Sequence, residues 1–229
     1  MVKGRKWRKK MEKKLRIGLI LDMHPFDEIS FKKMFDEMEG IEVVPMLLNN
    51  YQYDYSGIND QYDGFVFYNM SMETPDPEET FAGGHKKVGE TLFKIGESGQ
   101  GIVVLHHAIL SHPEWSGWND LLSIPDRRFD YFGGVNVDIH VAEPNHPIAE
   151  GLKDWNMIDE TFLLQDAGED CDIILSTTCE KSIKTLAWAK SYKQSRVFAM
   201  SLGHDGVAFG NESFRKVLKN AIEWTCNKR

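Results

Sequence analysis

The feature that most constrains the fold is a short apolar run that ends in two histidines. Residues 101–105 read Gly-Ile-Val-Val-Leu, and His106 and His107 follow at once. A continuous apolar run with β-branched residues is typical of a parallel strand buried on both faces of a sheet. In open α/β sheets, ligands bind in the crevice beyond the carboxyl ends of the strands. We therefore expect both histidines at that crevice, where imidazole can transfer protons or bind a metal.

Strands and helices alternate in the first half of the chain. The predicted strands cover residues 15–21, 41–48, 64–68 and 102–105, and the predicted helices cover 27–38 and 76–98. This alternation predicts an α/β fold with a doubly wound, mostly parallel sheet flanked by helices, of the flavodoxin-like type. Pro45 lacks a backbone N–H, which places the second strand at a sheet edge or a bulge.

The second half departs from this alternation. Residues 135–142 alternate apolar and polar side chains, which indicates a half-exposed antiparallel strand. Three more strands (172–176, 185–189, 196–202) and two helices (115–122, 213–226) complete the prediction. Extra antiparallel strands are thus expected in this half. Since no repeat or linker is present, we expect one domain over residues 15–229, preceded by a basic, flexible extension over residues 1–14.

Charge is distributed unevenly along the 229 residues. The chain has a net charge of −8, yet its first 16 residues contain nine Lys or Arg and one Glu. The remainder therefore carries −16, which argues against nucleic acid as a partner. The basic start is best interpreted as a solvated, frayed terminus rather than an interaction arm. Met11 competes with Met1 as the native start.

The sequence favours a cytoplasmic protein. No apolar run approaches the length of about 20 residues that a membrane span requires. The apolar stretch 17–21 is too short for a signal peptide, and no small-residue cleavage site follows it. Cys171, Cys179 and Cys226 are odd in number and lack C-x-x-C spacing, so neither a disulfide framework nor a zinc ribbon is indicated.

Four segments together carry a resemblance to a known family. They are GIVVLHHAILSHPEW (101–115), EPNHPIAEGL (143–152), IDETF (158–162) and RVFAMSLGHD (196–205). In order and spacing they resemble the ThuA-like, or trehalose-utilisation, family, a branch of the class I glutamine amidotransferase-like fold. The resemblance covers about residues 15–226. It implies a protein of carbohydrate metabolism that handles sugars or oxidised sugars.

One departure from the amidotransferase relatives changes the expected chemistry. Those relatives place a cysteine nucleophile on the turn after the central strand, where this chain has His106. Because hydrolysis of glutamine there requires a thiolate, the chain is not expected to be a glutamine amidotransferase. Leu202-Gly-His-Asp205 resembles, in position, the later His-x-acid element of those relatives.

Three residues are the candidates for catalysis. His106 and His204 follow two apolar strands and would move protons. Glu160 would assist them, with the adjacent Asp159 pointing into solvent because neighbouring carboxylates rarely share a face. Each candidate also has a structural alternative. His106 could be a buried histidine bonded to the backbone, His204 a histidine in a turn, and Glu160 a helix cap or a surface acid.

Five further residues are candidates for substrate binding: His24, His107, Glu114, Trp115 and Asp205. His24 follows the first strand and would come near the loop after residue 105. Trp115 could stack on a sugar ring, although tryptophan more often packs in a core. Asp205 would either orient His204 or bind amides of its own turn.

Cofactors are left open by the sequence. His24, His106, His204 and Glu160 could converge on a divalent metal such as zinc, but no local spacing such as H-E-x-x-H supports it, so no metal ligand is assigned. No glycine-rich phosphate loop is present, which disfavours nucleotide cofactors.

The leading hypothesis is an enzyme that acts on a disaccharide or keto-sugar by histidine and carboxylate acid–base chemistry, as a hydrolase, lyase or isomerase. The first alternative is a non-catalytic sugar-binding or sensing module, and the second is a metal-dependent hydrolase. The expected partner is a small carbohydrate, with no nucleic acid and no membrane. Homo-oligomerisation stays open.

Overall fold

The computed structural model describes residues 13–81, 84 and 86–227. The basic extension predicted over residues 1–14 therefore lies, apart from Lys13 and Lys14, outside the described residues. The strands in chain order are β1 (Leu15–Asp22), β2 (Ile41–Met46), β3 (Gly64–Asn69), β4 (Gly101–Leu105), β5 (Asp130–Val141), β6 (Trp155–Leu163), β7 (Asp172–Ser176), β8 (Thr185–Tyr192) and β9 (Ser195–Met200). The α-helices are α1 (Glu28–Asp36), α2 (Leu48–Tyr53), α3 (Val88–Thr91), α4 (Ser116–Leu122), α5 (Gly206–Gly210) and α6 (Glu212–Thr225).

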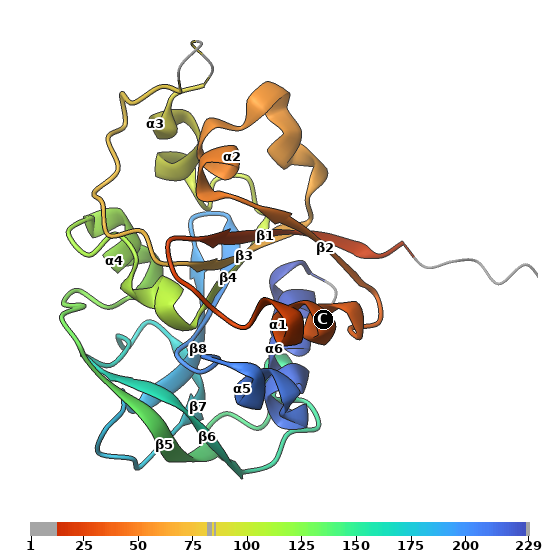
Figure 1. The fold of residues 1–229 in the computed structure, drawn as a ribbon, viewed down its shortest axis with the longest axis vertical. Coiled ribbons are helices and arrows are strands. Elements are labelled where there is room, and N and C mark those ends of the chain that lie inside the picture. The colour runs from red at the N-terminus through yellow and green to blue at the C-terminus, as the bar shows by residue number, and fades with distance from the viewer. Residues whose placement is uncertain (1–12, 82–83, 85, 228–229) are drawn as a thin grey trace, which may run out of the picture.

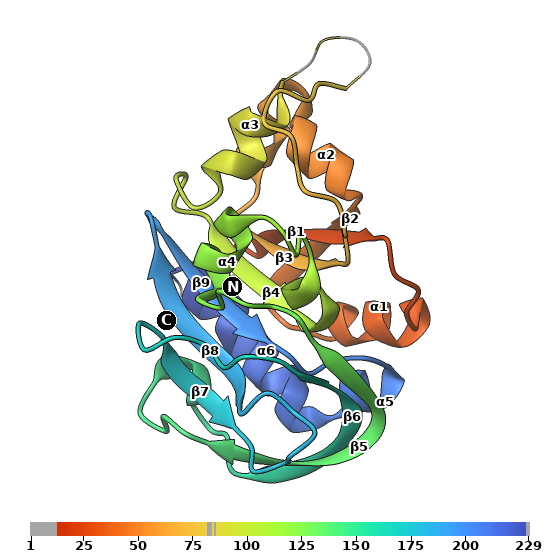
Figure 2. The same ribbon diagram turned by 90° about the vertical axis from the view of Figure 1, so that its left-hand side faces the viewer.

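The strands that the structure describes form one nine-stranded mixed sheet. Their order is β2-β1-β3-β4-β9-β8-β7-β5-β6. The first five in this order run parallel, and each later neighbour pairs antiparallel. Figures 1 and 2 show the helices on either side of the parallel half and the antiparallel strands curving below it. The α/β class, the antiparallel second half and the edge position of the strand with Pro45 are confirmed, and the flavodoxin-like winding stays a prediction.

Two apolar clusters cover the two faces of the parallel strands. Alternate residues of β3 show this division, because Val66 and Tyr68 belong to one cluster while Phe65 and Phe67 belong to the other. Helices α1, α5 and α6 pack on the first face, and α2, α3 and α4 pack on the second. The parallel strands are thus buried on both sides, as their continuous apolar sequence requires.

Side-chain caps fix where the two longer helices begin. Asp27 accepts a hydrogen bond from the backbone N–H of Ser30 at the start of α1, and Asn211 accepts one from Phe214 at the start of α6. Both are favoured N-cap residues, since they satisfy a backbone donor that has no partner within the helix.

Helix α6 approaches the sheet closely at two glycines. A Cβ atom on Gly101 would lie 2.8 Å from Thr225 and 2.9 Å from Sγ of Cys226, and one on Gly64 would lie 2.8 Å from the same sulfur. Only glycine permits this contact between the helix end and the starts of β3 and β4. Cys226 therefore lies at the amino ends of the strands.

The helix predicted over residues 76–98 is wrong. Among the residues of this segment that the structure describes, Val88–Thr91 alone is α-helical, and a short 3-10 turn follows it. The segment folds back on itself instead: the N–H of Gly89 donates to the carbonyl of Pro77, and Gly84 has a φ of +73°. Gly84 disfavours a helix, and the close approach of Pro77 requires a glycine at residue 89, where a Cβ would lie only 2.6 Å from the Pro77 oxygen.

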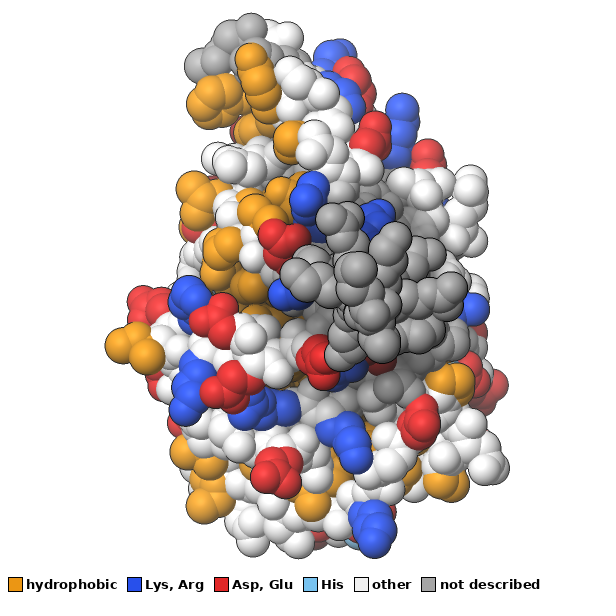
Figure 3. Space-filling model, turned by 90° about the vertical axis from the view of Figure 1, so that its right-hand side faces the viewer, with side chains coloured by type: hydrophobic (Ala, Val, Ile, Leu, Met, Phe, Trp, Pro, Cys, Tyr) orange, Lys and Arg blue, Asp and Glu red, His pale blue; other side chains and the backbone are white. Residues whose placement is uncertain are grey.

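On the described part of the face in Figure 3, Lys and Arg side chains lie among Asp and Glu side chains. Within the described residues, no helix is both long enough and apolar enough to cross a membrane.

Candidate functional site

Three of the predicted residues meet beyond the carboxyl ends of the parallel strands. His106 follows β4 directly, and His204 lies in the loop after β9. These strands are parallel neighbours, with Leu105 paired to Met200, so the segments after them emerge at the same edge. Glu160 comes from β6, at the far end of the strand order. The curvature of the antiparallel strands, visible in Figure 2, returns β6 to this edge. We call His106, Glu160 and His204 the trio.

The reactive atoms of the trio lie within a few ångströms of one another. Nε2 of His106 is 3.2 Å from Nδ1 of His204. Oε1 of Glu160 is 3.6 Å from the first of these nitrogens and 3.4 Å from the second. The His106 side chain is fully buried, whereas 16% of Glu160 and 34% of His204 is exposed. The trio is therefore closed to solvent at His106 and open to solvent at Glu160 and His204.

The backbone and its partners hold the His106 ring in one orientation. His106 has a φ of +52°, an uncommon conformation for a side-chain-bearing residue, at the turn from β4 into the 3-10 helix η3 (His106–Leu110). Its Nδ1 lies 2.7 Å from the carbonyl oxygen of Ser201. Because a carbonyl only accepts, Nδ1 carries the proton in this contact. When the ring is neutral, the lone pair of Nε2 faces His204 and Glu160.

Asp159 does not point into solvent, and that part of the prediction is wrong. Only 3% of this residue is exposed. Its carboxylate accepts hydrogen bonds from the backbone N–H groups of Gly203 (2.7 Å), His204 (3.0 Å) and Glu160 (2.9 Å). Burial raises the pKa of Asp159, and the nearby His106 and these N–H groups oppose the shift. Adjacent residues of a strand face opposite ways, so Asp159 holds the His204 loop while Glu160 faces the two imidazoles.

The contact with His106 holds the pKa of Glu160 below its usual value, and the charges of His204 and His24 act in the same direction. Glu160 is therefore a carboxylate at neutral pH. It can accept a proton or bind a cation.

His24 and His107 lie beside the trio as a stacked pair. Their ring centroids are 4.4 Å apart, and the His24 ring lies 6.5 Å from that of His204. Nε2 of His107 donates to the carbonyl of Tyr68, so its Nδ1 is an acceptor. Burial lowers the pKa of His107 to about 2, and His106 and His24 add to the shift. His107 is therefore neutral at physiological pH, and its buried ring packs against His106 and His24. The half-buried His24 lies closer to solvent.

The other three predicted binding residues are placed differently. Trp115 is buried and packs against Phe93, His112 and Trp118, so its ring is not open for a sugar to stack on. Glu114 is exposed, and no contact joins it to the trio among the described residues. Asp205 caps the short helix α5, because its carboxylate accepts a hydrogen bond from the backbone N–H of Val207. Asp205 thus binds an amide of its own turn, the structural role that the sequence offered as the alternative to orienting His204.

Sequence reasoning missed the part played by Tyr68. Its hydroxyl donates to the carbonyl of Gly203 at 2.9 Å, and its ring packs against His107. Tyr68 lies at the end of β3, so its position at the same edge was the available signal. Together with Asp159, it fixes the loop that carries His204.

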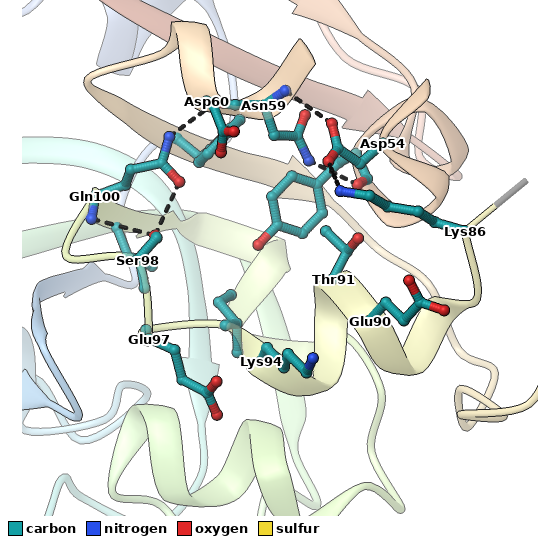
Figure 4. A pocket seen from close by; sticks show the side chains of 15 residues that line it. Asp54, Asn59, Asp60, Lys86, Glu90, Thr91, Lys94, Glu97, Ser98 and Gln100 are labelled. Carbon is teal, nitrogen blue, oxygen red and sulfur yellow. Dashed lines mark hydrogen bonds and ion pairs between the residues drawn. The ribbon is translucent and has the colours of Figure 1, made fainter. Parts of the chain in front are cut away.

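A separate cavity lies at the opposite edge of the sheet. It measures about 300 Å³ and includes Phe65 and Ile102, near the starts of β3 and β4. Figure 4 shows Lys86 reaching Asp54 across this cavity, where the two form an ion pair of 2.6 Å. No residue of the trio lines it. Gln100 also bonds to Asn59 there, whereas Oδ1 of Asn59 and Oγ1 of Thr91 have no hydrogen-bond partner. Because the described residues that line the cavity include no histidine and no member of the trio, we place the functional site at the trio.

Comparisons with solved structures agree with this architecture. A ThuA-like protein from Parabacteroides merdae aligns with a TM-score of 0.72 and 15% identity, covering 95% of this chain and 91% of that one. A cytoplasmic protein from Salmonella typhimurium gives 0.64 and 14%, covering 92% and 99%. PurLQS from Thermotoga maritima gives 0.54 and 12%, also covering 92% and 99%. At these identities the likeness shows the fold.

Among curated proteins, none matches this sequence. The family model named ThuA and described as trehalose utilisation matches residues 31–225, which is most of the chain. On this match, and with its fold shared by ThuA-like structures, the chain belongs to the ThuA (trehalose utilisation) family.

Proposed function

We propose that this chain is an enzyme of carbohydrate metabolism that acts on a disaccharide or keto-sugar by acid–base chemistry at the trio. The observation that carries the proposal is the convergence of two imidazoles and one carboxylate within 3.2–3.6 Å at the strand ends. Membership of a family described by trehalose utilisation supports a sugar as the substrate.

The groups of the trio suit proton transfer on a sugar. Glu160 is ionised at neutral pH and can accept a proton from a carbon or hydroxyl group of the substrate. His204, the most exposed of the three, faces the incoming substrate and exchanges protons with it. His106 contacts Glu160 and His204 from the buried side of the site, and the carbonyl of Ser201 fixes the orientation of its ring.

The cysteines support chemistry other than glutamine hydrolysis. Cys226 lies at the opposite ends of the strands, against Gly64 and Gly101. Cys171 lies beside Asp170, and burial raises the pKa of its thiol, which disfavours the reactive thiolate. His106 occupies the turn after the central strand, where the amidotransferase relatives carry their nucleophile.

The proposal extends to the setting of the enzyme. The acidic body of the chain favours a small carbohydrate over nucleic acid or a membrane surface as its partner. The structurally similar Salmonella typhimurium protein is named as cytoplasmic, which favours the same compartment here. Homo-oligomerisation stays a prediction.

The test is product analysis on a panel of disaccharides and their keto derivatives, using NMR to follow conversion. We expect conversion by the native protein and its loss in His204→Ala and Glu160→Gln. The matched control is His140→Ala, because His140 is a partly exposed histidine paired with Asp138 and Asp154 away from the trio. Binding without conversion would favour a sugar-sensing module, and full activity in both trio variants would refute the proposed site.

A further inference from the structure

We infer that the trio is a binding site for a single divalent metal ion, and that zinc is the ion it fits. The inference rests on the proposed function only for what the ion would do to a sugar. Within the described part of the chain, the trio is the one group of three or more histidine, cysteine or acidic side chains whose ligand atoms converge closely enough to hold an ion.

The spacing of the three ligand atoms matches tetrahedral zinc. Zinc bonds to histidine nitrogen and carboxylate oxygen measure about 2.0–2.2 Å, so two ligands of a tetrahedral ion lie about 3.3–3.6 Å apart. The three separations in the trio are 3.2, 3.4 and 3.6 Å. A point about 2.1 Å from all three atoms lies about 0.7 Å out of their plane, which is where a tetrahedral zinc ion would lie.

An octahedral ion fits this spacing less well. The same two-histidine, one-carboxylate set also occurs in non-haem iron(II) sites. With bonds of about 2.1 Å at right angles, neighbouring ligands would lie about 3.0 Å apart. Two of the three observed separations exceed that value clearly, by about 0.4 and 0.6 Å. The trio therefore favours the tetrahedral ion.

The surroundings orient the trio as metal ligands are usually oriented. A ligating histidine normally donates its other ring N–H to a carbonyl or carboxylate, and His106 does so to Ser201 at 2.7 Å. The loop that carries His204 is held by the Asp159 carboxylate through two backbone N–H groups. Glu160 supplies the negative charge that an imidazole ligand does not bring to a metal ion.

The exposure of the ligands leaves a coordination position open. Structural zinc sites are closed by four protein ligands, while catalytic sites have three and keep the fourth for water or substrate. Two histidines and one glutamate make up such a three-ligand set, and the trio opens to solvent beside Glu160 and His204. A bound ion there would polarise a sugar carbonyl or activate a water molecule, and the trio would then act as ligands instead of exchanging protons.

The rival explanation of the same geometry is a shared proton. Without an ion, the His204 Nδ1–H can donate to Nε2 of His106 across 3.2 Å. The two explanations differ in what the protein takes up from solution, since only the first predicts stoichiometric binding of zinc.

The test uses full-length protein purified without a histidine tag, stripped with a chelator and titrated calorimetrically with zinc chloride. We expect one zinc ion per chain, and tetrahedral ligand-field absorption when cobalt(II) replaces zinc. Loss of a second-shell group already costs 10–100-fold in metal affinity, so His204→Ala and Glu160→Gln should weaken binding by at least about 100-fold. His140→Ala should bind zinc like the native protein.

Absence of zinc uptake by the native protein, or equal affinity in the trio variants, would overturn the inference. Neither trio variant removes the buried His106 ring, so loss of binding can be separated from loss of fold by melting each variant. Sugar conversion is measured on the same stripped samples. If sugar conversion is unchanged and no zinc is taken up, the metal site is refuted and the proposed function stands. If zinc is taken up but no sugar is converted, the metal site stands and the proposed function is refuted.

Discussion

Nε2 of His106 lies 3.2 Å from Nδ1 of His204, although 98 positions separate the two residues in the chain. The contact follows from strand register. Leu105 at the end of β4 pairs with Met200 at the end of β9, and both strands run in the same direction. Any residue that follows one strand is therefore close to those that follow the other.

Asp159→Asn should loosen the loop that carries His204. An amide cannot accept all the backbone hydrogen bonds that the buried carboxylate receives, and its own N–H₂ would face one of these donors. We expect the free energy of unfolding, measured in urea, to fall by about 1–3 kcal/mol, with a parallel loss of turnover. Asp154→Asn is the control, because Asp154 also accepts a backbone N–H, from Val141, but is exposed. Equal effects in the two variants would contradict this role of Asp159.

His106→Gly should be more stable than His106→Ala. Both variants delete the ring, but the backbone φ of +52° is strained for alanine and free for glycine. The expected difference is about 1 kcal/mol in the free energy of unfolding. At Ser111, where φ is −61°, the same pair of substitutions should show alanine as the more stable. If alanine is favoured at both positions, residue 106 does not adopt a positive φ.

Gly101→Ala should disturb the packing of α6 on the sheet. The new methyl group would lie within 3 Å of Thr225 and Cys226, and overpacking of this kind costs about 1–3 kcal/mol. Gly133→Ala is the matched control, since a Cβ there meets nothing within 4 Å, and its effect should stay within about 0.5 kcal/mol. Thermal melting compares the two variants, and equal melting temperatures would refute the close approach.

His112 should make the protein less stable as the pH falls below about 6.5. Burial lowers the pKa of His112 in the folded state, whereas the unfolded chain keeps the usual value of about 6.5. Between these values the unfolded state binds a proton that the folded state does not, so stability declines with falling pH, by at most about 1.4 kcal/mol per pH unit.

His112→Asn removes this titration with little change to the backbone. Asparagine tolerates the φ of +50° at this position, and its amide N–H can replace Nδ1 as donor to the carbonyl of Glu73. Urea unfolding between pH 7.5 and 5.5 should show a shallower loss of stability in the variant. Identical slopes would mean that His112 titrates normally in the fold.

The fold was predictable where hydrophobic pattern and strand burial agree. The apolar run 102–105 lies within β4, which is buried throughout, and the predicted strand 172–176 coincides with β7, in which Ile174 and Leu175 are buried. Strand β6 was not predicted, because its inward positions include Asp159 and Thr161, which hide the apolar alternation. The helix predicted over residues 76–98 does not form. Gly84 is a local signal against it, but the hydrogen bond between Gly89 and Pro77 that shapes the segment is a contact that the sequence does not reveal.

The site was predictable to the extent that strand ends determine it. His106 and His204 end apolar strands, and parallel strands share an edge. Glu160 could be chosen only loosely, because its approach depends on how the antiparallel strands curve. The inward position of Asp159 and the burial of Trp115 depend on tertiary contacts far along the chain, which one sequence does not contain.

The most direct test of the account is a crystal structure of the Glu160→Gln variant with a bound disaccharide. We predict that the sugar lies at the strand ends, with polar atoms within hydrogen-bond distance of His204 and of the residue 160 amide. A sugar bound instead in the cavity beside Asp54 and Lys86, with the trio untouched, would contradict the central claim.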